Sequence, residues 1–439
     1  MEKLDFSIPV LGKCTVQSPI SLSKKMGDYV ANYVSDNEYI IYDIETGADR
    51  AVHSFARNEL LEKAGPRERI YFESAKVNAG VVTCGGLCPG LNNVIRAIVM
   101  CLWYHYNAKR ICGFRYGYRG FVPQFNLPVM ELKPEVVLNI HRSGGTILGS
   151  SRGHGDRTEE IVDTLERINI NILFTIGGDG TQKAALGISS EIRKRGLKIA
   201  VVGVPKTIDN DLSFVQKSFG FETAVSKAVD AVTGAHVEAV GAPNGVGIVK
   251  VMGKQSGFIA AHTALATNDV NYVLVPEVPF DLDGENGLLR HLGKRLEQRG
   301  HAVILVAEGA GQELMNVSGD VDASGNRKLA DIGVFLKERI NAYFKAKQIE
   351  INLKYIDPSY IIRSMPANPN DSIYCAILGT NAVHAAMAGK SELLVSLVHN
   401  NFVHIPMRMA ISRKNRINPD GGLWRDVTTA TGQPLLMKN

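Results

Sequence analysis

The sequence predicts an α/β protein whose strands are mostly parallel. From residue 77 onward, short apolar runs of strand type alternate with segments in which apolar residues recur at helical spacing. Such alternation is typical of layered α/β folds, because a helix connects each strand to the next parallel one. The chain has 439 residues, 45% of them hydrophobic and 21% charged, which is enough for two globular domains of about 100–200 residues each.

Residues 1–75 do not follow this alternation. The run Tyr39-Ile-Ile-Tyr-Asp predicts one short strand, and residues 64–69, Ala-Gly-Pro-Arg-Glu-Arg, indicate a linker. We therefore expect an N-terminal extension that packs on the main body.

The elements of the main body are predicted from apolar runs bounded by Gly, Pro and polar residues. The expected strands are 77–84, 110–115, 170–176, 197–204, 245–251, 271–275, 301–307 and 349–355. The expected helices include 91–102, 183–195, 284–299 and 329–347. Asp281 or Asp283 is expected to cap the third helix. The fourth carries Leu329, Ile332 and Leu336 at helical spacing, which predicts core packing.

Charge and composition narrow the function classes. The net charge is +5 without a long basic block, so binding to nucleic acid is not indicated. No apolar run approaches the ~20 residues that span a bilayer, and the first residues lack a signal-peptide core. The six cysteines form no C-x-x-C pair and predict a reduced, cytoplasmic protein.

The heptad Pro205-Lys-Thr-Ile-Asp-Asn-Asp is the most informative motif. It follows an apolar strand, and proline cannot continue a central strand, so the chain is expected to turn at Pro205. Asp209 and Asp211 would then lie at the end of a sheet, where carboxylates can move a proton or hold a metal. Taken alone, the heptad fits a helix cap and a solvated turn somewhat better than a catalytic site, because Thr, Asp and Asn favour caps and turns.

A second motif, Gly177-Gly-Asp-Gly-Thr181, joins a predicted strand to a predicted helix. Strand, glycine-rich turn and helix N-terminus form a phosphate-binding geometry, because backbone N–H groups and the helix dipole point at the anion. Asp179 within this turn would place a carboxylate beside the phosphate, which suits Mg²⁺. An ordinary strand-to-helix turn would explain the glycines but not the carboxylate.

Together with three further blocks, these motifs resemble the 6-phosphofructokinase family. The blocks are Gly85-Gly-Leu-Cys-Pro-Gly-Leu-Asn, Met252-Gly-Lys254 and Tyr360-Ile-Ile-Arg363, and all five occur in the family's order over roughly residues 70–410. The Pro-x-Thr-Ile-Asp-Asn-Asp block is highly specific, whereas Gly-Gly-Asp-Gly-Thr also occurs in NAD and diacylglycerol kinases. The resemblance implies two Rossmann-like three-layer α/β domains facing an active-site cleft.

The resemblance also assigns residues to the phosphoryl donor. ATP is the expected donor and Mg²⁺ the expected metal, held by Asp179 with Asp211 as support. Arg152, in the loop 144–153, would contact the nucleotide phosphates, although the loop alone fits a flexible surface segment. The full expected donor set is Gly86, Arg152, Gly153, Gly177, Gly178, Asp179, Gly180 and Thr181.

On the acceptor side, the resemblance implies that Asp209 takes the proton from the 1-hydroxyl of fructose 6-phosphate. Lys206 would stabilise charge on the transferring group. Lys254 stands where many family members have arginine, so its sugar contact lacks bidentate geometry. The expected substrate set is Thr207, Ile208, Asp209, Met252, Gly253, Lys254, Glu308, Tyr360, Ile361, Ile362 and Arg363, and the catalytic set is Asp209, Lys206 and Asp211.

Two positions bear on the choice between ATP and pyrophosphate. In the family, glycine after Gly-Gly-Asp leaves room for the α-phosphate of ATP, and here that residue is Gly180. Lysine before Thr-Ile-Asp-Asn-Asp is typical of pyrophosphate enzymes, and here that residue is Lys206. The mixed pattern resembles plant and trypanosomatid ATP-dependent enzymes, and Gly180 carries more weight because an aspartate there would exclude ATP.

The resemblance therefore implies an allosteric glycolytic kinase for fructose 6-phosphate that forms a homo-oligomer, a dimer or tetramer. A pyrophosphate-dependent enzyme is the alternative. A lipid or NAD kinase would leave Pro205–Asp211 unexplained, and a catalytically dead regulatory subunit is opposed by Asp179, Asp209 and Asp211. The predicted divisions are an extension at 1–75, a donor domain at 76–220 with part of 362–410, a sugar domain at 221–361 and a tail at 411–439.

Overall fold

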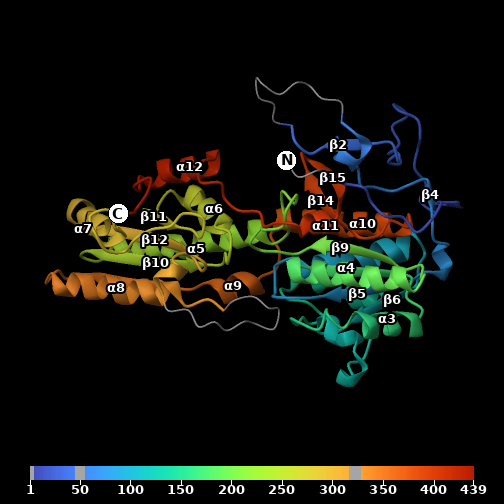
Figure 1. Ribbon diagram of the computed structural model, residues 1–439, viewed down its shortest axis with the longest axis horizontal. Helices are drawn as coiled ribbons and strands as arrows, with labels where there is room; N and C mark the ends of the chain where they lie inside the picture. The colour runs from blue at the N-terminus through green and yellow to red at the C-terminus, as the bar shows by residue number, and fades with distance from the viewer. Residues whose placement is uncertain (1–3, 45–54, 316–327) are drawn as a thin grey trace. The chain divides into compact units, whose positions relative to one another are not determined.

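The computed structural model describes residues 4–44, 55–315 and 328–439. They form two compact units, each built on its own sheet (Figure 1). The first unit comprises Met1–Thr207, Leu212–Gly220 and Pro366–Arg413, and the second comprises Ile208–Asp211, Phe221–Met365 and Lys414–Asn439. The predicted α/β class is confirmed, whereas the predicted domain divisions stay predictions. Parts of the predicted extension (1–3 and 45–54) and of the predicted sugar domain (316–327) lie outside the described residues.

The sheet of the first unit has the strand order β15-β14-β9-β8-β5-β6-β7. Its five central strands are parallel, and β15 and β7 pair antiparallel at the two edges. The strands are β5 (Asn78–Thr83), β6 (Arg110–Phe114), β7 (Met130–Glu131), β8 (Ile172–Gly177), β9 (Ala200–Pro205), β14 (Leu393–Val398) and β15 (Asn401–Pro406). Strands β5, β8 and β9 are neighbours, so the loops at their carboxyl ends meet at one edge of the sheet.

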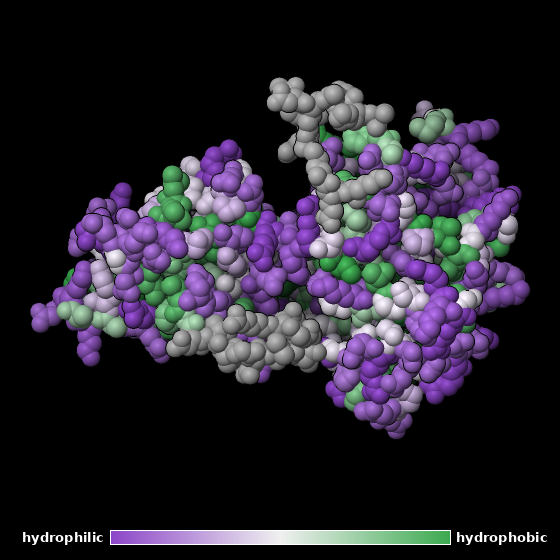
Figure 2. Space-filling view, viewed as in Figure 1, coloured by the Kyte–Doolittle hydropathy of each residue, from purple (hydrophilic) through white to green (hydrophobic). Residues whose placement is uncertain are grey.

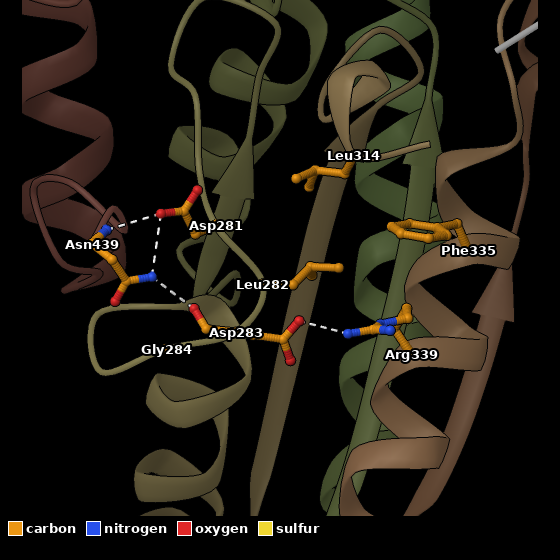
Figure 3. A pocket seen from close by; sticks show the side chains of 8 residues that line it. All are labelled: Asp281, Leu282, Asp283, Gly284, Leu314, Phe335, Arg339 and Asn439. Carbon is orange, nitrogen blue, oxygen red and sulfur yellow. Dashed lines mark hydrogen bonds and ion pairs between the residues drawn. The ribbon is translucent and has the colours of Figure 1, made fainter. Parts of the chain in front are cut away.

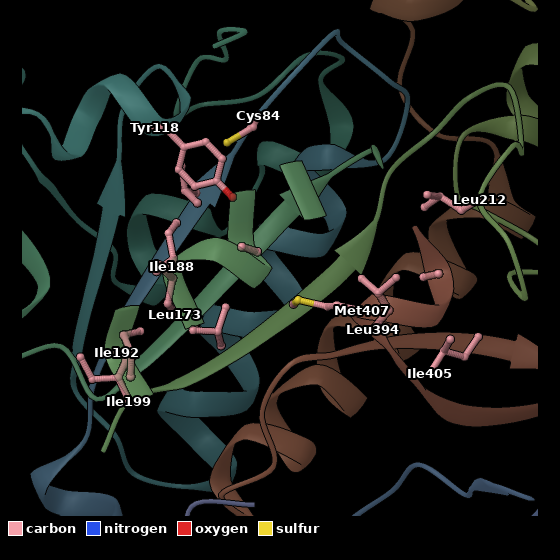
Figure 4. Close-up of a cluster of buried hydrophobic side chains, with 14 of the residues drawn as sticks. Cys84, Tyr118, Leu173, Ile188, Ile192, Ile199, Leu212, Leu394, Ile405 and Met407 are labelled. Atoms are coloured by element: carbon pink, nitrogen blue, oxygen red, sulfur yellow. The ribbon is translucent and has the colours of Figure 1, made fainter. Parts of the chain in front are cut away.

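The helices of the first unit are α1 (Leu91–Met100), α2 (Pro134–Val137), α3 (Thr158–Arg167), α4 (Asp179–Lys194), α10 (Pro369–Met387) and α11 (Met407–Ala410). Apolar side chains of α3, α4 and α11 pack with inward residues of the sheet, including Leu173 and Leu394, in one buried cluster (Figure 4). Helices α1 and α10 pack on each other, and α10 packs on β9 and β14, outside that cluster.

The N-terminal segment contains two strand pairs of its own and is attached to the rest of the first unit by a backbone hydrogen bond and an ion pair. Strand β1 (Val16–Gln17) pairs with β4 (Arg69–Ile70), and β2 (Tyr39–Ile41) pairs with β3 (Leu60–Glu62). The backbone N–H of Ala64 donates to Phe402 O at 2.7 Å, and Lys390 Nζ lies 2.6 Å from Glu62 Oε2. The interpretation of residues 64–69 as a linker is wrong, because Arg67 is buried and donates to Asp36 Oδ1 at 2.8 Å.

The second unit has a four-stranded parallel sheet in the order β11-β12-β10-β13. Its strands are β10 (Gly245–Val251), β11 (Tyr272–Leu274), β12 (His301–Ala307) and β13 (Asn352–Ile356). Its helices are α5 (Phe221–Val240), α6 (Phe258–Thr267), α7 (Leu288–Arg299), α8 (Ile332–Ala346), α9 (Ser359–Ser364) and α12 (Gly422–Thr431). Alternate residues of β10 and β12 pack with α5, α6 and α12 in one cluster and with α7 and α8 in another, which gives three layers (Figure 1).

Several predicted element boundaries are corrected by the structure. Helix α4 begins at Asp179, four residues before the predicted start, and β9 includes Pro205 as its last residue, so the turn begins at Lys206. Neither Asp281 nor Asp283 caps α7, whose N-cap is Gly287. Their carboxylates are engaged elsewhere, by the N–H of Asn439 and by Arg339 respectively.

The surface in Figure 2 is mostly hydrophilic, and its apolar side chains occur in separate groups. Among the described residues, no helix is both long enough and apolar enough to cross a membrane.

Candidate active site

In the first unit, the predicted donor residues lie after β5, at the junction of β8 and α4, and in the loop 144–153. Gly177 ends β8, Gly178 is the N-cap of α4, and Asp179, Gly180 and Thr181 form its first turn. The N-cap, Gly178, has no side chain that could bond to the helix, and the first N–H groups at this end are the kind that bind anions. The early start of α4 therefore places the whole motif at a helix N-terminus.

Each glycine of this motif stands in a different environment. A Cβ at Gly177 would lie 2.2 Å from Thr181 Oγ1, so only glycine fits there. A Cβ at Gly178 would lie 3.2 Å from Lys206 O, which is a tight contact. A Cβ at Gly180 would meet nothing within 4 Å, so space rather than backbone conformation is what glycine provides at that position.

Lys206 links the loops after β9 and β5. Its side chain is buried, and Nζ donates to Gly86 O at 2.6 Å. The loop 144–153 packs on the same turn, where Ser150 Oγ donates to Gly85 O at 2.6 Å and the Gly85 N–H donates to Ser151 O at 2.9 Å. The structure thus brings together Gly86, Lys206 and the loop that carries Gly153 and the exposed Arg152.

Asp179 fits the role of a single carboxylate ligand beside bound phosphates. Its Oδ2 lies 3.0 Å from Lys183 Nζ, one turn along α4. Within the described residues, no group of three or more His, Cys, Asp and Glu side chains could enclose a metal ion. Mg²⁺ usually takes one or two carboxylates together with substrate phosphates, so an all-protein cage is not required.

In the second unit, the predicted sugar residues lie at the carboxyl ends of β10, β12 and β13. The register aligns Val251 with Ala307, so Met252 follows β10 beside Glu308, which follows β12. The Gly309 N–H donates to Gly253 O at 3.0 Å and ties the two loops together. Gly253 has a φ of +131°, and a Cβ there would lie 2.4 Å from Ser256 O, so glycine is required.

Asp209 belongs to the second unit, where the loop after β10 holds it. The boundary between the units passes through the heptad, because Thr207 belongs to the first unit and Ile208 to the second. Asp209 Oδ2 accepts the Lys254 N–H at 3.4 Å, and Asp209 O accepts the Ser256 hydroxyl at 3.0 Å. Oδ1 is buried and has no hydrogen-bond partner among the described residues.

The surroundings of Asp209 raise its pKa. Burial is the main cause, the charges of Asp211 and Glu308 add to it, and the Lys254 N–H and charge oppose it, so the pKa of Asp209 rises to about 7. Burial also raises the pKa of Glu308, against the charges of Lys254, Lys250 and Arg363. Asp209, Glu308, Lys254 and Arg363 therefore form one electrostatically coupled group.

Sequence reasoning missed three residues that hold the heptad. Lys414 Nζ lies 2.7 Å from Asp211 Oδ2, and the Asn415 N–H donates to Asp211 O at 2.9 Å. Ser256 holds the backbone of Asp209, as described above. The basic run Arg413-Lys-Asn-Arg416 was the only available signal for Lys414, because nothing in the sequence connects it with residue 211.

The four predicted substrate residues on helix α9 differ in their exposure to solvent. Tyr360 and Ile361 are 76% and 65% exposed, whereas Ile362 is fully buried in the core and can reach a substrate only through its backbone. The Arg363 guanidinium lies 4.9 Å from the Tyr360 ring centroid, and Nε donates to Ser359 O at 3.4 Å. The heptad carries two further predicted substrate residues. Ile208 packs on the same core, and Thr207 O accepts the Ser218 hydroxyl.

A cavity of about 520 Å³ elsewhere in the second unit contains none of the predicted site residues. It is lined by Asp281, Leu282, Asp283, Gly284, Leu314, Phe335, Arg339 and Asn439 (Figure 3). Asn439 donates hydrogen bonds to the Asp281 carboxylate and to Asp283 O, so these polar groups of the cavity wall bind one another.

Comparison with known proteins matches the family model described as phosphofructokinase over residues 78–386. An "ATP-dependent 6-phosphofructokinase" of Borreliella burgdorferi is 56% identical over 447 residues, covering 100% of this chain and 99% of that protein. A protein of the same name from Trypanosoma brucei brucei is 50% identical over 375 residues, covering 85% of this chain and 76% of that protein. A solved pyrophosphate-dependent phosphofructokinase from Marinobacter aquaeolei aligns with a TM-score of 0.67 at 20% identity, covering 81% and 91% of the two chains, a likeness of fold alone. The chain belongs to the phosphofructokinase family.

Proposed function

We infer that this protein is an ATP-dependent 6-phosphofructokinase, which transfers the γ-phosphoryl group of ATP to the 1-hydroxyl of fructose 6-phosphate. The observation that carries the inference is Asp209, a carboxylate held by the loop after β10 whose second oxygen is buried and has no partner among the described residues. Likeness over the whole chain to a protein named for this activity supports it. Assays with ATP and with pyrophosphate, each with fructose 6-phosphate, test the reaction and its donor together.

On the acceptor side, Asp209 acts as the general base. The backbone N–H of Lys254 donates to Oδ2 of Asp209. Its other oxygen, Oδ1, is buried and has no partner among the described residues, and we assign it to the sugar hydroxyl. A base works best with a pKa near the operating pH, and burial gives Asp209 such a value. In a largely dissociative transfer the base mainly orients the hydroxyl and takes its proton late.

Activity is expected to fall as the pH falls below about 7. The base must be ionised, and a pKa raised to about 7 means that Asp209 is protonated and inactive below that value. We expect kcat/KM for fructose 6-phosphate to fall about tenfold for each pH unit below this point. A pH profile with circular dichroism at each pH tests this, and a flat profile through neutral pH would contradict the assignment.

On the donor side, the N–H groups at the start of α4 receive the phosphates, and Lys206 and Arg152 add positive charge. Asp179 is the residue we assign to Mg²⁺, which when bound neutralises charge on the transferring phosphoryl group. Gly86, Gly153, Gly177, Gly178 and Thr181 keep the backbone close to the nucleotide. Lys206 and Asp209 belong to one heptad, so a single short segment carries a cation for the donor and the base for the acceptor.

The donor is assigned to ATP rather than pyrophosphate. The space beside Gly180 supports this choice, because no atom lies within 4 Å of the place that a side chain would occupy. Lys206 does not distinguish ATP from pyrophosphate, because its ammonium has a structural role: it donates a hydrogen bond to Gly86 O.

Arg363 is assigned to the 6-phosphate of the sugar, together with Tyr360. Replacing Arg363 by alanine is expected to raise the KM for fructose 6-phosphate about 10–100-fold and to change kcat little. This range corresponds to the free energy of one lost hydrogen bond to a charged group. Arg425→Ala, which removes an exposed arginine of the same unit, is the matched control. Steady-state kinetics measures both, and an unchanged KM in Arg363→Ala would remove the residue from this role.

We also propose that the protein is a homo-oligomer, a dimer or tetramer, that it is allosteric and that it works in the cytoplasm. Exposed apolar residues such as Ile373, 61% exposed on α10, support association. Sedimentation velocity at several concentrations would reveal a monomer if the first proposal is wrong.

A further inference from the structure

Lys250 connects three elements of the second unit. It lies near the end of β10, and its side chain is only 12% exposed. Its ammonium lies 2.8 Å from Asp331 Oδ2 and 2.9 Å from Asp357 Oδ2. One buried cation thus bridges two carboxylates, one at the start of α8 and one just before α9.

Both carboxylates divide their oxygens in the same way. Asp331 is the N-cap of α8, and its Oδ1 accepts the N–H groups of Gly333 and Val334 at 3.0 and 3.1 Å. Asp357 Oδ1 accepts the N–H and the hydroxyl of Ser359 at 3.0 and 2.5 Å. In each case one oxygen holds the start of a helix and the other binds Lys250.

The group keeps its charges at neutral pH. Burial disfavours the charged form of Lys250, but the hydrogen bonds to Asp331 and Asp357 outweigh it and raise its pKa above the ordinary value. Burial raises the pKa of both carboxyls, and their hydrogen bonds outweigh it, so both pKa values lie below the ordinary value.

Helix α9 is held by contacts with the rest of the unit because it is short, and the Lys250 group holds its start while Ile362 holds its buried side. It has six residues, and no side chain of its N-cap, Pro358, bonds to it. A helix of this length is not stable through its own hydrogen bonds, so tertiary contacts must hold it. The contacts run from Lys250 to Asp357, from Asp357 to Ser359, and from Ser359 O to Arg363 Nε.

We propose that Lys250 is a positioning residue for the recognition of the sugar 6-phosphate. By fixing the start of α9 against the end of β10, it sets where Arg363 and Tyr360 lie with respect to Lys254 and Glu308. This inference rests on the proposed role of Arg363. Lys250 touches no substrate in this account and acts through Asp357 and α9.

The test compares Lys250→Met, Lys250→Arg and the control Lys227→Met, which removes a lysine paired with Asp230 on the surface of the same unit. Lys250→Met is expected to raise the KM for fructose 6-phosphate about tenfold or more, because small displacements of a binding group have large effects, while the KM for ATP stays within about twofold. Lys250→Arg keeps the charge and should restore most of the affinity. The control should match the native enzyme.

A second variant guards against misfolding of the first. Asp357→Asn keeps an oxygen for the Ser359 N–H but loses the charge that binds Lys250, so it should shift the same KM in the same direction. The double variant with Lys250→Met should be less than additive, because both changes break one connection.

The outcomes separate this inference from the function on which it rests. If Arg363→Ala raises the KM for the sugar and Lys250→Met does not, the positioning role of Lys250 is wrong and the sugar site stands. If neither variant changes that KM, the assignment of Arg363 is wrong and the inference fails with it. If Lys250→Met raises both KM values and lowers kcat equally, the residue serves the general fold and the inference is also overturned.

Discussion

Replacing Asp209 by asparagine is expected to lower kcat by about 10²–10⁴-fold, the usual cost of losing a general base. The amide has the same shape but cannot accept a proton from the sugar hydroxyl. Binding of fructose 6-phosphate should be nearly unchanged, because the asparagine oxygen can still accept the Lys254 N–H. Kinetics together with calorimetric titration of the sugar measures the two effects separately.

Loss of folding cannot account for that result if stability changes as we expect. The pKa of Asp209 is raised in the folded protein, so folding opposes its ionisation and the carboxylate costs stability. This cost grows as the pH rises from the ordinary pKa of 3.8 to about 7 and stays constant above. Asp209→Asn should therefore melt at the same temperature as the native protein or higher at pH values above about 7.

Asp230→Asn, a change to a surface carboxylate of the same unit, is the matched control and should keep native kinetics. If Asp209→Asn also keeps a kcat close to native, another group takes the proton.

Replacing Gly180 by aspartate is expected to suppress the use of ATP. A carboxylate about 4 Å from a phosphate oxygen costs about 4 kcal/mol at an effective dielectric constant of about 20, which corresponds to a loss of roughly 10²–10³-fold. The fold should remain intact, because Gly180 lies in the first turn of α4 and the space for its Cβ is open. Assays with both donors and circular dichroism measure these effects.

Two controls separate size from charge at this position. Gly180→Ala should be mild, and Gly180→Asn matches the size of aspartate without its charge. If asparagine is as damaging as aspartate, steric exclusion explains the loss instead of repulsion. If the native enzyme prefers pyrophosphate, the donor assignment itself is wrong.

Gly180 lies in helix α4 and not in the predicted turn, but the space beside it is open, as the resemblance implied. The motif Gly-Gly-Asp-Gly predicts that its last glycine, Gly180, belongs to a turn, but helix α4 already includes Gly180 and Thr181. Gly177 is the glycine that the backbone requires, because the Thr181 side chain fills the space beside it. Sequence alone could not distinguish the two, since only neighbouring atoms show which glycine has room for a side chain.

The sequence by itself determined the strands β8, β10 and β12 closely, along with the motifs at their ends. Apolar runs bounded by glycine and proline specify such strands through local chemistry alone, and parallel pairing gathers their carboxyl ends at one edge. Prediction failed for β14 and β15, which pair antiparallel at the sheet edge, and for α5 and α10, which it did not anticipate. The run of β14, Leu-Leu-Val-Ser-Leu-Val, is as apolar as that of β8, so its sequence did indicate a strand, whereas β15 mixes Asn401 and His404 with its apolar residues.

Only the tertiary structure decided how the candidate site is supported. Lys250 and Asp331 are 81 residues apart, and Asp211 and Lys414 are 203 apart. Helical and strand periodicity records which face of an element is buried but not which distant side chain it meets. Likewise, the motif predicted Asp209 as the base, but its pKa of about 7 arises from burial and from Asp211 and Glu308, which only folding brings together.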